Sequence, residues 1–303
     1  MTPQHRRHLL EGQRAAARYA FAPPTRVQTG LAGALMANRP GSSLEFMDHR
    51  AYQPGDDLRR IDWSAFARSD RLTVKLYRQE VNPHVDILLD ASRSMDLAGT
   101  AKGAAALSLA ALLAGAADNA GYTHAAWAGR ETFQPVPNGA AAPVAWEGID
   151  FDYRQGHPAA TGGGGDADGL AGSFAAAAGQ FRPRSIRVLL SDLLWAGDPT
   201  LALSPLSASA AAVVVVQLLA EADVDPPPHG NVRLTDSETD EEQEIFVDAA
   251  ARSRYRDALA RHQQNWHRAA SQCGAVMTTL VAERFLRDWN LDELLEAGVL
   301  HVT

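Results

Sequence analysis

From about residue 84 onward, short runs of apolar side chains alternate with longer stretches whose apolar positions follow helical spacing. The runs at 85–89, 186–191 and 211–219 are almost wholly apolar, as expected of strands buried on both faces of a sheet. Helices are expected at 101–119, 170–181, 249–273 and 285–297, and further strands at 122–128, 131–136, 232–235, 244–247 and 275–281. This order predicts an α/β fold with a doubly wound, mainly parallel sheet and helices on both of its faces.

The first 80 residues follow a different pattern. Residues 72–77 are rich in β-prone side chains, and Pro54-Gly55 marks a turn. We therefore expect a small strand-rich block over 30–80, preceded by a basic arm over 1–29. The α/β domain then covers 81–303, with an acidic hairpin inserted at about 228–248.

Charge is spread unevenly along the chain. The formal net charge is −8, which makes nucleic acid and anionic membranes poor candidates as partners of the whole molecule. Residues 1–26 carry five arginines against one glutamate, and such an arm is expected to be a solvated tail. Residues 221–248 carry ten acidic side chains against one arginine.

Cys273 is the only cysteine, so an intrachain disulfide is impossible and a reducing compartment is favoured. The N-terminal residues lack the apolar core of a signal peptide. The most apolar stretches, 103–117 and 210–219, are shorter than the ~20 residues of a spanning helix. We expect a soluble, cytoplasmic protein without a membrane span.

The candidate chemistry lies where two predicted strands end. Asp90 closes the first strand and is followed by Ser92 and Ser94, while Asp192 closes a later strand. The carboxyl ends of parallel strands meet in one crevice, and two carboxylates there repel unless a cation lies between them. Carboxylates and hydroxyls are ligands that Mg²⁺ or a similar divalent cation prefers. The alternative is that both aspartates cap helices or loops and that the serines satisfy loop amides.

The same residues resemble two related groups of proteins. The Asp90-Ala91-Ser92-Arg93-Ser94 motif, with a long helix behind it and Asp192 downstream, resembles the metal-ion-dependent adhesion site of von Willebrand factor A domains. Upstream, residues 44–46, 50–63, 67–68 and 72–75 resemble the signature of domain-of-unknown-function family 58, as do residues 234–239 with Tyr255. The resemblance covers the chain from about residue 30 to its end.

The resemblance implies a von Willebrand factor A-like domain that carries its own N-terminal block and often acts with a MoxR-type AAA+ ATPase. It implies a metal site at Asp90, Ser92, Ser94 and Asp192. The threonine that such sites take from an intervening loop has no clear counterpart here. Asp166 falls near the expected position, and Thr161, at the start of the glycine run, is the alternative.

The N-terminal block contains a dense mixture of charges and turn residues. We expect them either to form a salt-bridge network that packs the block on the α/β domain or to contact a partner. Tyr52 and Trp63 are expected in the core. The residues of this motif are Arg50, Tyr52, Pro54, Gly55, Asp56, Asp57, Arg59, Asp62, Trp63 and Arg68.

These observations favour a protein that binds rather than catalyses: a metal-ion-dependent interaction module or adaptor in a chaperone-like or assembly complex. One alternative is a metal-dependent hydrolase with Asp90 as nucleophile. The position two residues on, where a phosphatase of that kind has its acid, is Ser92. The other alternative is a structural domain with a degenerate metal site.

Overall fold

The computed structural model describes residues 3–22, 44–79, 83–129, 133–136, 149, 151, 174, 177–195, 197–225, 230–237 and 241–303. The chain forms two compact units. The N-terminal unit is Thr29–Asn82, and the main unit consists of Met1–Gln28 together with Pro83–Thr303.

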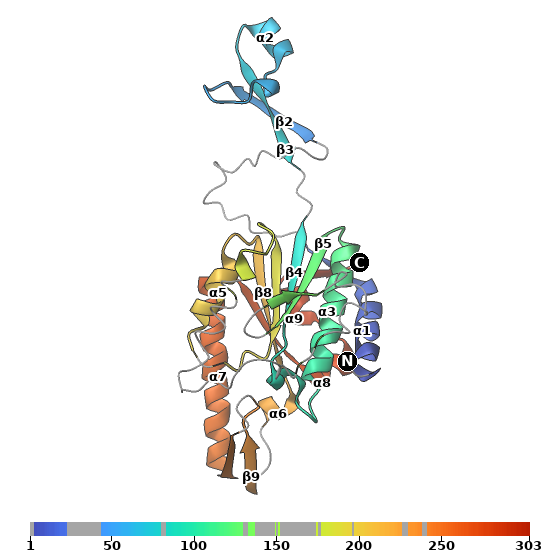
Figure 1. Cartoon of the computed structure of the whole chain (residues 1–303), viewed down its shortest axis with the longest axis vertical. Coiled ribbons are helices and arrows are strands. Elements are labelled where there is room, and N and C mark those ends of the chain that lie inside the picture. The colour runs from blue at the N-terminus through green and yellow to red at the C-terminus, as the bar shows by residue number, and fades with distance from the viewer. Residues whose placement is uncertain are drawn as a thin grey trace. The chain divides into compact units, whose positions relative to one another are not determined.

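A six-stranded sheet forms the centre of the main unit (Figure 1). Its strand order is β11-β8-β7-β4-β5-β6, and every neighbouring pair is parallel except β5 and β6. The strands are β4 (His84–Asp90), β5 (Thr123–Gly129), β6 (Phe133–Pro135), β7 (Ile186–Ser191), β8 (Ala212–Leu219) and β11 (Val276–Val281). The predicted α/β fold with a mainly parallel sheet is confirmed.

Two apolar layers cover the sheet, because successive side chains of a buried strand point to opposite faces. Ile87 and Leu89 of β4 pack with α3 (Lys102–Asn119) and α8 (Ala282–Asp288), whereas Leu88 packs with α5 (Pro199–Ser207) and α7 (Ala249–Gln272). Figure 1 shows α3 and α7 on opposite sides of the strands. The continuous apolar runs of the central strands follow from burial on both faces.

The basic arm expected as a solvated tail is instead part of this core. Helix α1 (Pro3–Ala15) packs along α3, and Leu9 is fully buried there. A Cβ on Gly12 would collide with the carbonyl oxygen of Ser108, so the two helices approach closely at a residue that has no side chain. Strand β1 (Tyr19–Phe21) then pairs with β12 (Leu300–Val302), which joins both ends of the main unit. The many arginines of this segment made it look solvated, so the apolar stripe that α1 buries was not predicted.

The end of the chain departs from the expected single helix over 285–297. It forms α8 and the short α9 (Asp292–Glu296), separated at Trp289, whose φ of 51° lies in the left-handed region and ends α8. Helix α5 was not expected, since Pro205 interrupts its pattern. Within the expected helix over 170–181, Phe174, Ala177 and Ala178 are helical. Residues 170–173, 175 and 176 lie outside the described part of the chain.

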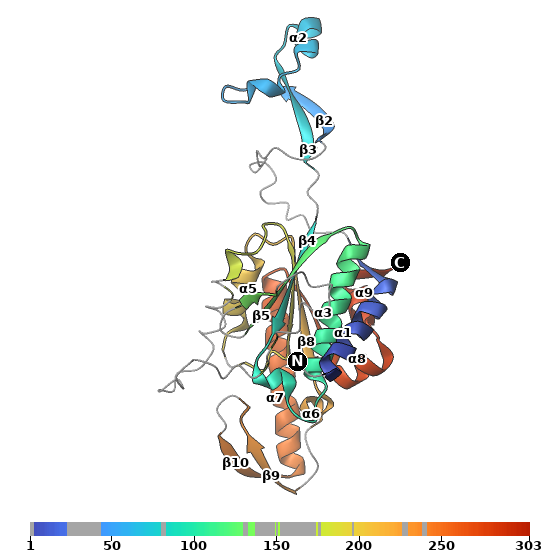
Figure 2. The ribbon, with the colours of Figure 1, turned by 45° about the vertical axis from the view of Figure 1, so that its right-hand side comes forward.

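Several elements leave the carboxyl edge of the sheet (Figure 2). Helix α6 (Glu221–Val224) follows β8, and the expected acidic hairpin forms from β9 (Gly230–Thr235) and β10 (Glu242–Val247). Arg233 on β9 pairs with Glu242 and Glu244 on β10. In the described part of the chain, every helix is too short or too polar to cross a membrane.

The N-terminal unit contains the antiparallel strands β2 (Leu44–Ala51) and β3 (Thr73–Gln79) and the helix α2 (Trp63–Ser69). Asp62 begins α2, because its carboxylate accepts hydrogen bonds from the amides of Ser64 and Ala65. The expectation that Trp63 and Tyr52 belong to the core is wrong for Trp63, which is 61% exposed, while Tyr52 is half-buried. Trp63 is the first residue of α2, and its ring makes an edge-on contact with Phe66 of the same helix.

Candidate functional site

Asp90 and Asp192 lie at neighbouring strand ends, as the sequence predicts. Strands β4 and β7 pair in parallel, Asp90 is the last residue of β4, and Asp192 directly follows β7. Both side chains are buried. The carboxyl edge of the sheet therefore holds two acidic groups out of contact with bulk water.

The hydrogen bonds around Asp90 hold its carboxylate in place. Its Oδ1 accepts from the Ser92 amide at 2.9 Å, and its Oδ2 accepts from the Ser191 hydroxyl at 2.6 Å. Burial and the nearby Asp192 carboxylate nevertheless raise the pKa of Asp90 above its usual value. The negative charge at Asp90 thus lacks sufficient compensation from hydrogen bonds alone.

The two motif serines lie next to each other. The hydroxyl oxygens of Ser92 and Ser94 are 3.0 Å apart, Ser92 is buried, and Ser94 lies in a short 3-10 turn over Arg93–Asp96. Both therefore present oxygen at the carboxyl end of β4. The two expected loop ligands, Asp166 and Thr161, lie outside the described residues.

Sequence reasoning missed a lysine that belongs to this group of side chains. The ammonium nitrogen of Lys102, at the start of α3, lies 2.9 Å from Asp192 Oδ2 and 3.2 Å from Asp223 Oδ2. Its side chain is 1% exposed. Burial alone would lower the pKa of Lys102, but the two carboxylates outweigh it and raise the pKa. In the sequence, Lys102 looks like an exposed first-turn residue of an alanine-rich helix.

We call Asp90, Ser92, Ser94, Lys102 and Asp192 the carboxyl-edge site. Gln217 on β8 donates to the backbone oxygen of Asp192 at 3.0 Å, which fixes the chain after β7. Leu193, the residue after Asp192, has a φ of 57°, a left-handed conformation that is costly for leucine. His262 on α7 forms a hydrogen bond of 2.7 Å with the Leu193 carbonyl. The turn behind Asp192 is therefore held from two directions.

Glu283 ties the neighbouring helices together at the same edge. Its Oε1 accepts from the Ala101 amide, immediately before α3, and its Oε2 accepts from the Glu221 amide at the start of α6. These bonds connect the helix that carries Lys102 with the helix that carries Asp223. The carboxyl ends of β4, β7, β8 and β11 thus all contribute to one polar network.

The donor set fits a hard divalent cation in chemical type. It offers two hydroxyls and two carboxylates, all oxygen, in a place where Asp90 lacks a balancing charge. One positive charge is already supplied by Lys102. Across the described ranges, no group of three or more His, Cys, Asp or Glu side chains is placed to hold a metal. Any cation here would therefore depend on the serines.

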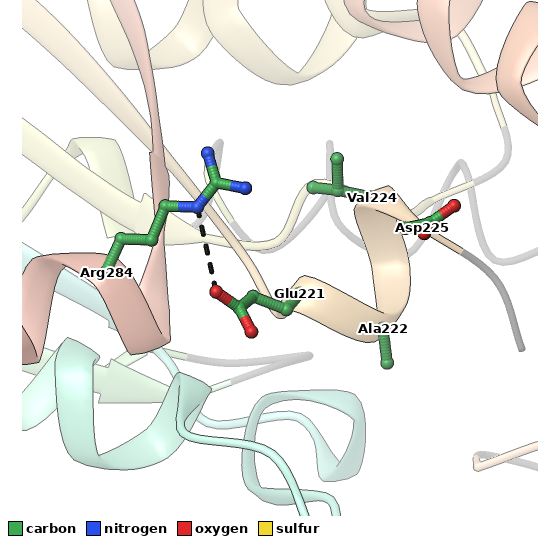
Figure 3. Close-up of a pocket in the computed structure, with 5 residues that line it drawn as sticks. All are labelled: Glu221, Ala222, Val224, Asp225 and Arg284. Carbon is green, nitrogen blue, oxygen red and sulfur yellow. Dashed lines mark ion pairs between the residues drawn. The ribbon is translucent and has the colours of Figure 1, made fainter.

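A surface hollow of about 390 Å³ lies against α6 (Figure 3). Arg284 and Glu221 point toward each other across it, 3.7 Å apart at their nearest charged atoms. Its lining is Glu221, Ala222, Val224, Asp225 and Arg284. The hollow is open and its charges are paired, so it offers few unpaired groups to a ligand.

In the N-terminal unit, several charged side chains pair within the unit itself. Arg50 pairs with Asp56 at 2.6 Å. Asp62 lies 2.7 Å from His49 and 3.6 Å from Lys75. The Ala65 amide at the start of α2 and then these two side chains and the Ser64 amide lower the pKa of Asp62 to about 2.

The other motif residues of the N-terminal unit shape its turns and its surface. Asp57 accepts from the amide of Arg59, and Gly55 adopts φ of 105° in the turn after Pro54. Pro54, Arg59 and Arg68 are exposed, as Trp63 is. Ion pairs therefore hold Asp56 and Asp62 and an amide hydrogen bond holds Asp57, while the exposed side chains could contact another surface.

Comparison with known proteins places the chain in a family. An uncharacterised protein of Mycobacterium tuberculosis, Rv1480, is 30% identical over 261 residues, which are 84% of this chain and 78% of that protein. The uncharacterised Mycobacterium bovis protein Mb1516 matches equally. An uncharacterised Mycobacterium avium protein, MAV169, is 35% identical over 113 residues, 37% of this chain and 63% of its own.

Two solved structures share a weaker likeness. The conserved hypothetical protein BatB from Bacteroides thetaiotaomicron gives a TM-score of 0.41 at 11% identity, covering 71% of this chain and 98% of its own. An aerotolerance-related membrane protein from Bacteroides fragilis gives a TM-score of 0.43 at 14% identity, covering 71% of this chain and 99% of its own.

Residues 48–265 match the family described as "Protein of unknown function DUF58". The chain therefore belongs to the DUF58 family.

Proposed function

We propose that this protein is a metal-ion-dependent protein-interaction module that serves as an adaptor. The observation that carries the proposal is the adjacent pair of hydroxyls of Ser92 and Ser94, 3.0 Å apart, beside the buried carboxylates of Asp90 and Asp192. These residues would hold Mg²⁺ or a similar divalent cation. When bound, the cation offers an open coordination position to a carboxylate of a partner protein. The likeness of the motif to von Willebrand factor A domains supports this assignment.

The partner we propose is a MoxR-type AAA+ ATPase, on the strength of the DUF58 resemblance. The exposed Trp63, Arg59 and Arg68 of the N-terminal unit would add a second contact surface. Aromatic and arginine side chains commonly supply the energy of protein interfaces.

Catalysis by Asp90 is disfavoured by its surroundings. Both carboxylate oxygens accept hydrogen bonds, and the position two residues on, where a phosphatase of this kind has its acid, is Ser92. The remaining alternative, a structural domain with a degenerate, metal-free site, is favoured by one specific contact. The Lys102 ammonium already pairs with Asp192.

The test is binding of the full chain to the purified MoxR-type ATPase of the same organism, with Mg²⁺ or with EDTA. Binding should weaken at least about tenfold with EDTA or in Ser92→Ala. Ser204→Ala, an exposed serine on α5, is the control and should bind as the wild type does. ATPase binding that is unchanged by EDTA and by Ser92→Ala would favour the metal-free alternative. Phosphatase turnover by the isolated chain that disappears in Asp90→Ala would favour the hydrolase.

A further inference from the structure

We propose that Lys102 is a built-in competitor of the divalent cation at Asp192, and that its ammonium leaves Asp192 and stays paired with Asp223 when the cation binds. This inference rests on the proposed metal site and deepens it. It assigns a role in metal affinity to a side chain outside the Asp-x-Ser-x-Ser motif.

The first step of the argument is the position of the ammonium group. Lys102 Nζ lies 2.9 Å from Asp192 Oδ2, and neither side chain is accessible to water. A buried charge is stable only when it is paired, so Lys102 and Asp192 neutralise each other in the absence of metal. A dication that approaches Asp192 therefore meets a positive charge already in contact with the same carboxylate.

The second step is the charge count at the site. Asp90 and Asp192 together carry two negative charges when ionised, and Lys102 contributes one positive charge. The Asp90 carboxylate accepts from the neutral Ser92 amide and Ser191 hydroxyl, whereas the ammonium of Lys102 pairs with Asp192 and Asp223 and so does not neutralise Asp90. The site thus retains some attraction for a cation, although Lys102 weakens it.

The third step is the presence of a second acceptor for the ammonium. Asp223 Oδ2 lies 3.2 Å from Lys102 Nζ, and the Asp223 side chain is 18% exposed. Because Asp223 also accepts from the Ala220 amide and its backbone oxygen accepts from Tyr255, it is held in place next to Lys102. A lysine that gives up Asp192 therefore remains paired. Exchange of the cation for the ammonium then leaves no buried charge alone.

The chain makes this exchange measurable, because it contains two lysines only, Lys75 and Lys102. Lys75 lies in the N-terminal unit and is 37% exposed, whereas Lys102 is 1% exposed. Amine-selective acetylation of the wild-type chain, read by peptide mass spectrometry, compares the two side chains in one sample. Without metal, Lys102 should react at least about tenfold more slowly than Lys75, since a buried, paired ammonium is poorly available. With saturating Mg²⁺, acetylation of Lys102 should rise severalfold while that of Lys75 stays unchanged.

Calorimetric titration of Mg²⁺ into the Lys102→Met variant provides the second measurement. Removing the ammonium should tighten Mg²⁺ binding at least about tenfold, because a like charge within a few ångströms of the cation is lost. Lys75→Met is the matched control and should leave the affinity unchanged. If Lys102→Met does not fold, Lys102→Gln, which keeps a neutral donor toward Asp192, replaces it.

The outcomes separate this inference from the proposed function. Equal Mg²⁺ affinity in the wild type and Lys102→Met, with unchanged protection of Lys102, would overturn the competitor role and leave the metal site standing. Binding only in Lys102→Met would support the competitor role and show that the wild-type chain works without metal. Failure of Mg²⁺ and Mn²⁺ to bind either chain would overturn both.

Discussion

The ammonium group of Lys102 decides how charge is balanced among the buried residues of the carboxyl-edge site. Its two acceptors differ: Asp192 is fully buried, whereas Asp223 reaches the surface. The ammonium contacts both carboxylates, so it keeps a charged partner when one of them binds another cation. Asp223 is therefore the residue that makes release of Asp192 energetically acceptable.

The substitution Asp223→Asn should weaken Mg²⁺ binding, opposite in direction to Lys102→Met. Without the Asp223 charge, displaced Lys102 would lack a charged partner in a buried place, and about a tenfold loss of affinity is expected. Calorimetric titration measures it. Asp257→Asn, on the exposed face of α7, is the control for removal of one negative charge. Tighter binding in Asp223→Asn would show that Asp223 holds Lys102 against release.

The sequence indicated the two aspartates and the two serines because each follows an apolar run that ends abruptly. It could not indicate Lys102, since a lysine in the first turn of a helix is ordinarily solvated and the neighbours that bury it lie far along the chain. Ser191 was equally hidden, because it reads as the last residue of a strand. Contacts between separate strand ends become visible only when the strand order is known.

At the scale of elements, buried polar residues secure helices against the sheet. Arg187 on β7 is buried, and its guanidinium donates to the backbone oxygens of Leu206 and Ala208 at the end of α5, at 2.7 and 2.9 Å. The last carbonyls of a helix need such donors when they lie away from water. Burial lowers the pKa of Arg187, partly offset by Asp86, its register neighbour on β4.

The substitution Arg187→Met should therefore destabilise the main unit by about 3 kcal/mol, because it leaves buried carbonyls without donors and Asp86 without its nearby positive charge. Urea unfolding followed by circular dichroism measures the change. Arg182→Met removes an exposed arginine from the adjacent loop and should cost less than about 0.5 kcal/mol. Similar losses in both variants would mean that the helix end does not depend on Arg187.

Helix α2 depends on the ionised form of Asp62. The pKa of this carboxyl is lowered to about 2 by the amides of Ala65 and Ser64 and by His49 and Lys75. A lowered pKa stabilises the folded unit above the ordinary aspartate pKa of about 4, and that contribution is lost as the pH falls toward 2.

Hydrogen exchange of the Ser64 and Ala65 amides in the full chain should therefore accelerate between about pH 4 and pH 2 relative to the intrinsic rates. In Asp62→Asn, the same amides should be less protected at pH 5 and should change little on acidification. Protection that is independent of pH in the wild type would show that the carboxylate does not hold the start of α2.

The apolar pattern predicted the central strands well, because burial on both faces leaves long runs without polar residues. It failed where a single residue changes the backbone. Trp289 ends α8 in a left-handed conformation, which nothing in the apolar spacing of 285–297 reveals. It also failed for α1, where arginines surround the few residues that become buried.

At the scale of the whole molecule, the N-terminal helix closes the core of the main unit. Leu9 of α1 belongs to the same apolar cluster as Leu107 and Leu113 of α3, and β1 joins β12 at the far end of the chain. The first segment thus contributes to packing on the face of the sheet that also carries α8. A solvated tail would contribute nothing to stability.

Two neighbouring leucines on α1 can be used to test whether this segment is packed in the core or solvated. Leu9 is fully buried, and Leu10 is 39% exposed. The substitution Leu9→Ala should lower the free energy of unfolding by about 2–4 kcal/mol through lost burial and the cavity left behind, whereas Leu10→Ala should cost less than about 1 kcal/mol. Both are read from urea unfolding of the full chain by tryptophan fluorescence, to which five of the six tryptophans contribute from the main unit. Equal, small effects would place α1 outside the cooperative core and restore the solvated arm that the charge pattern suggests.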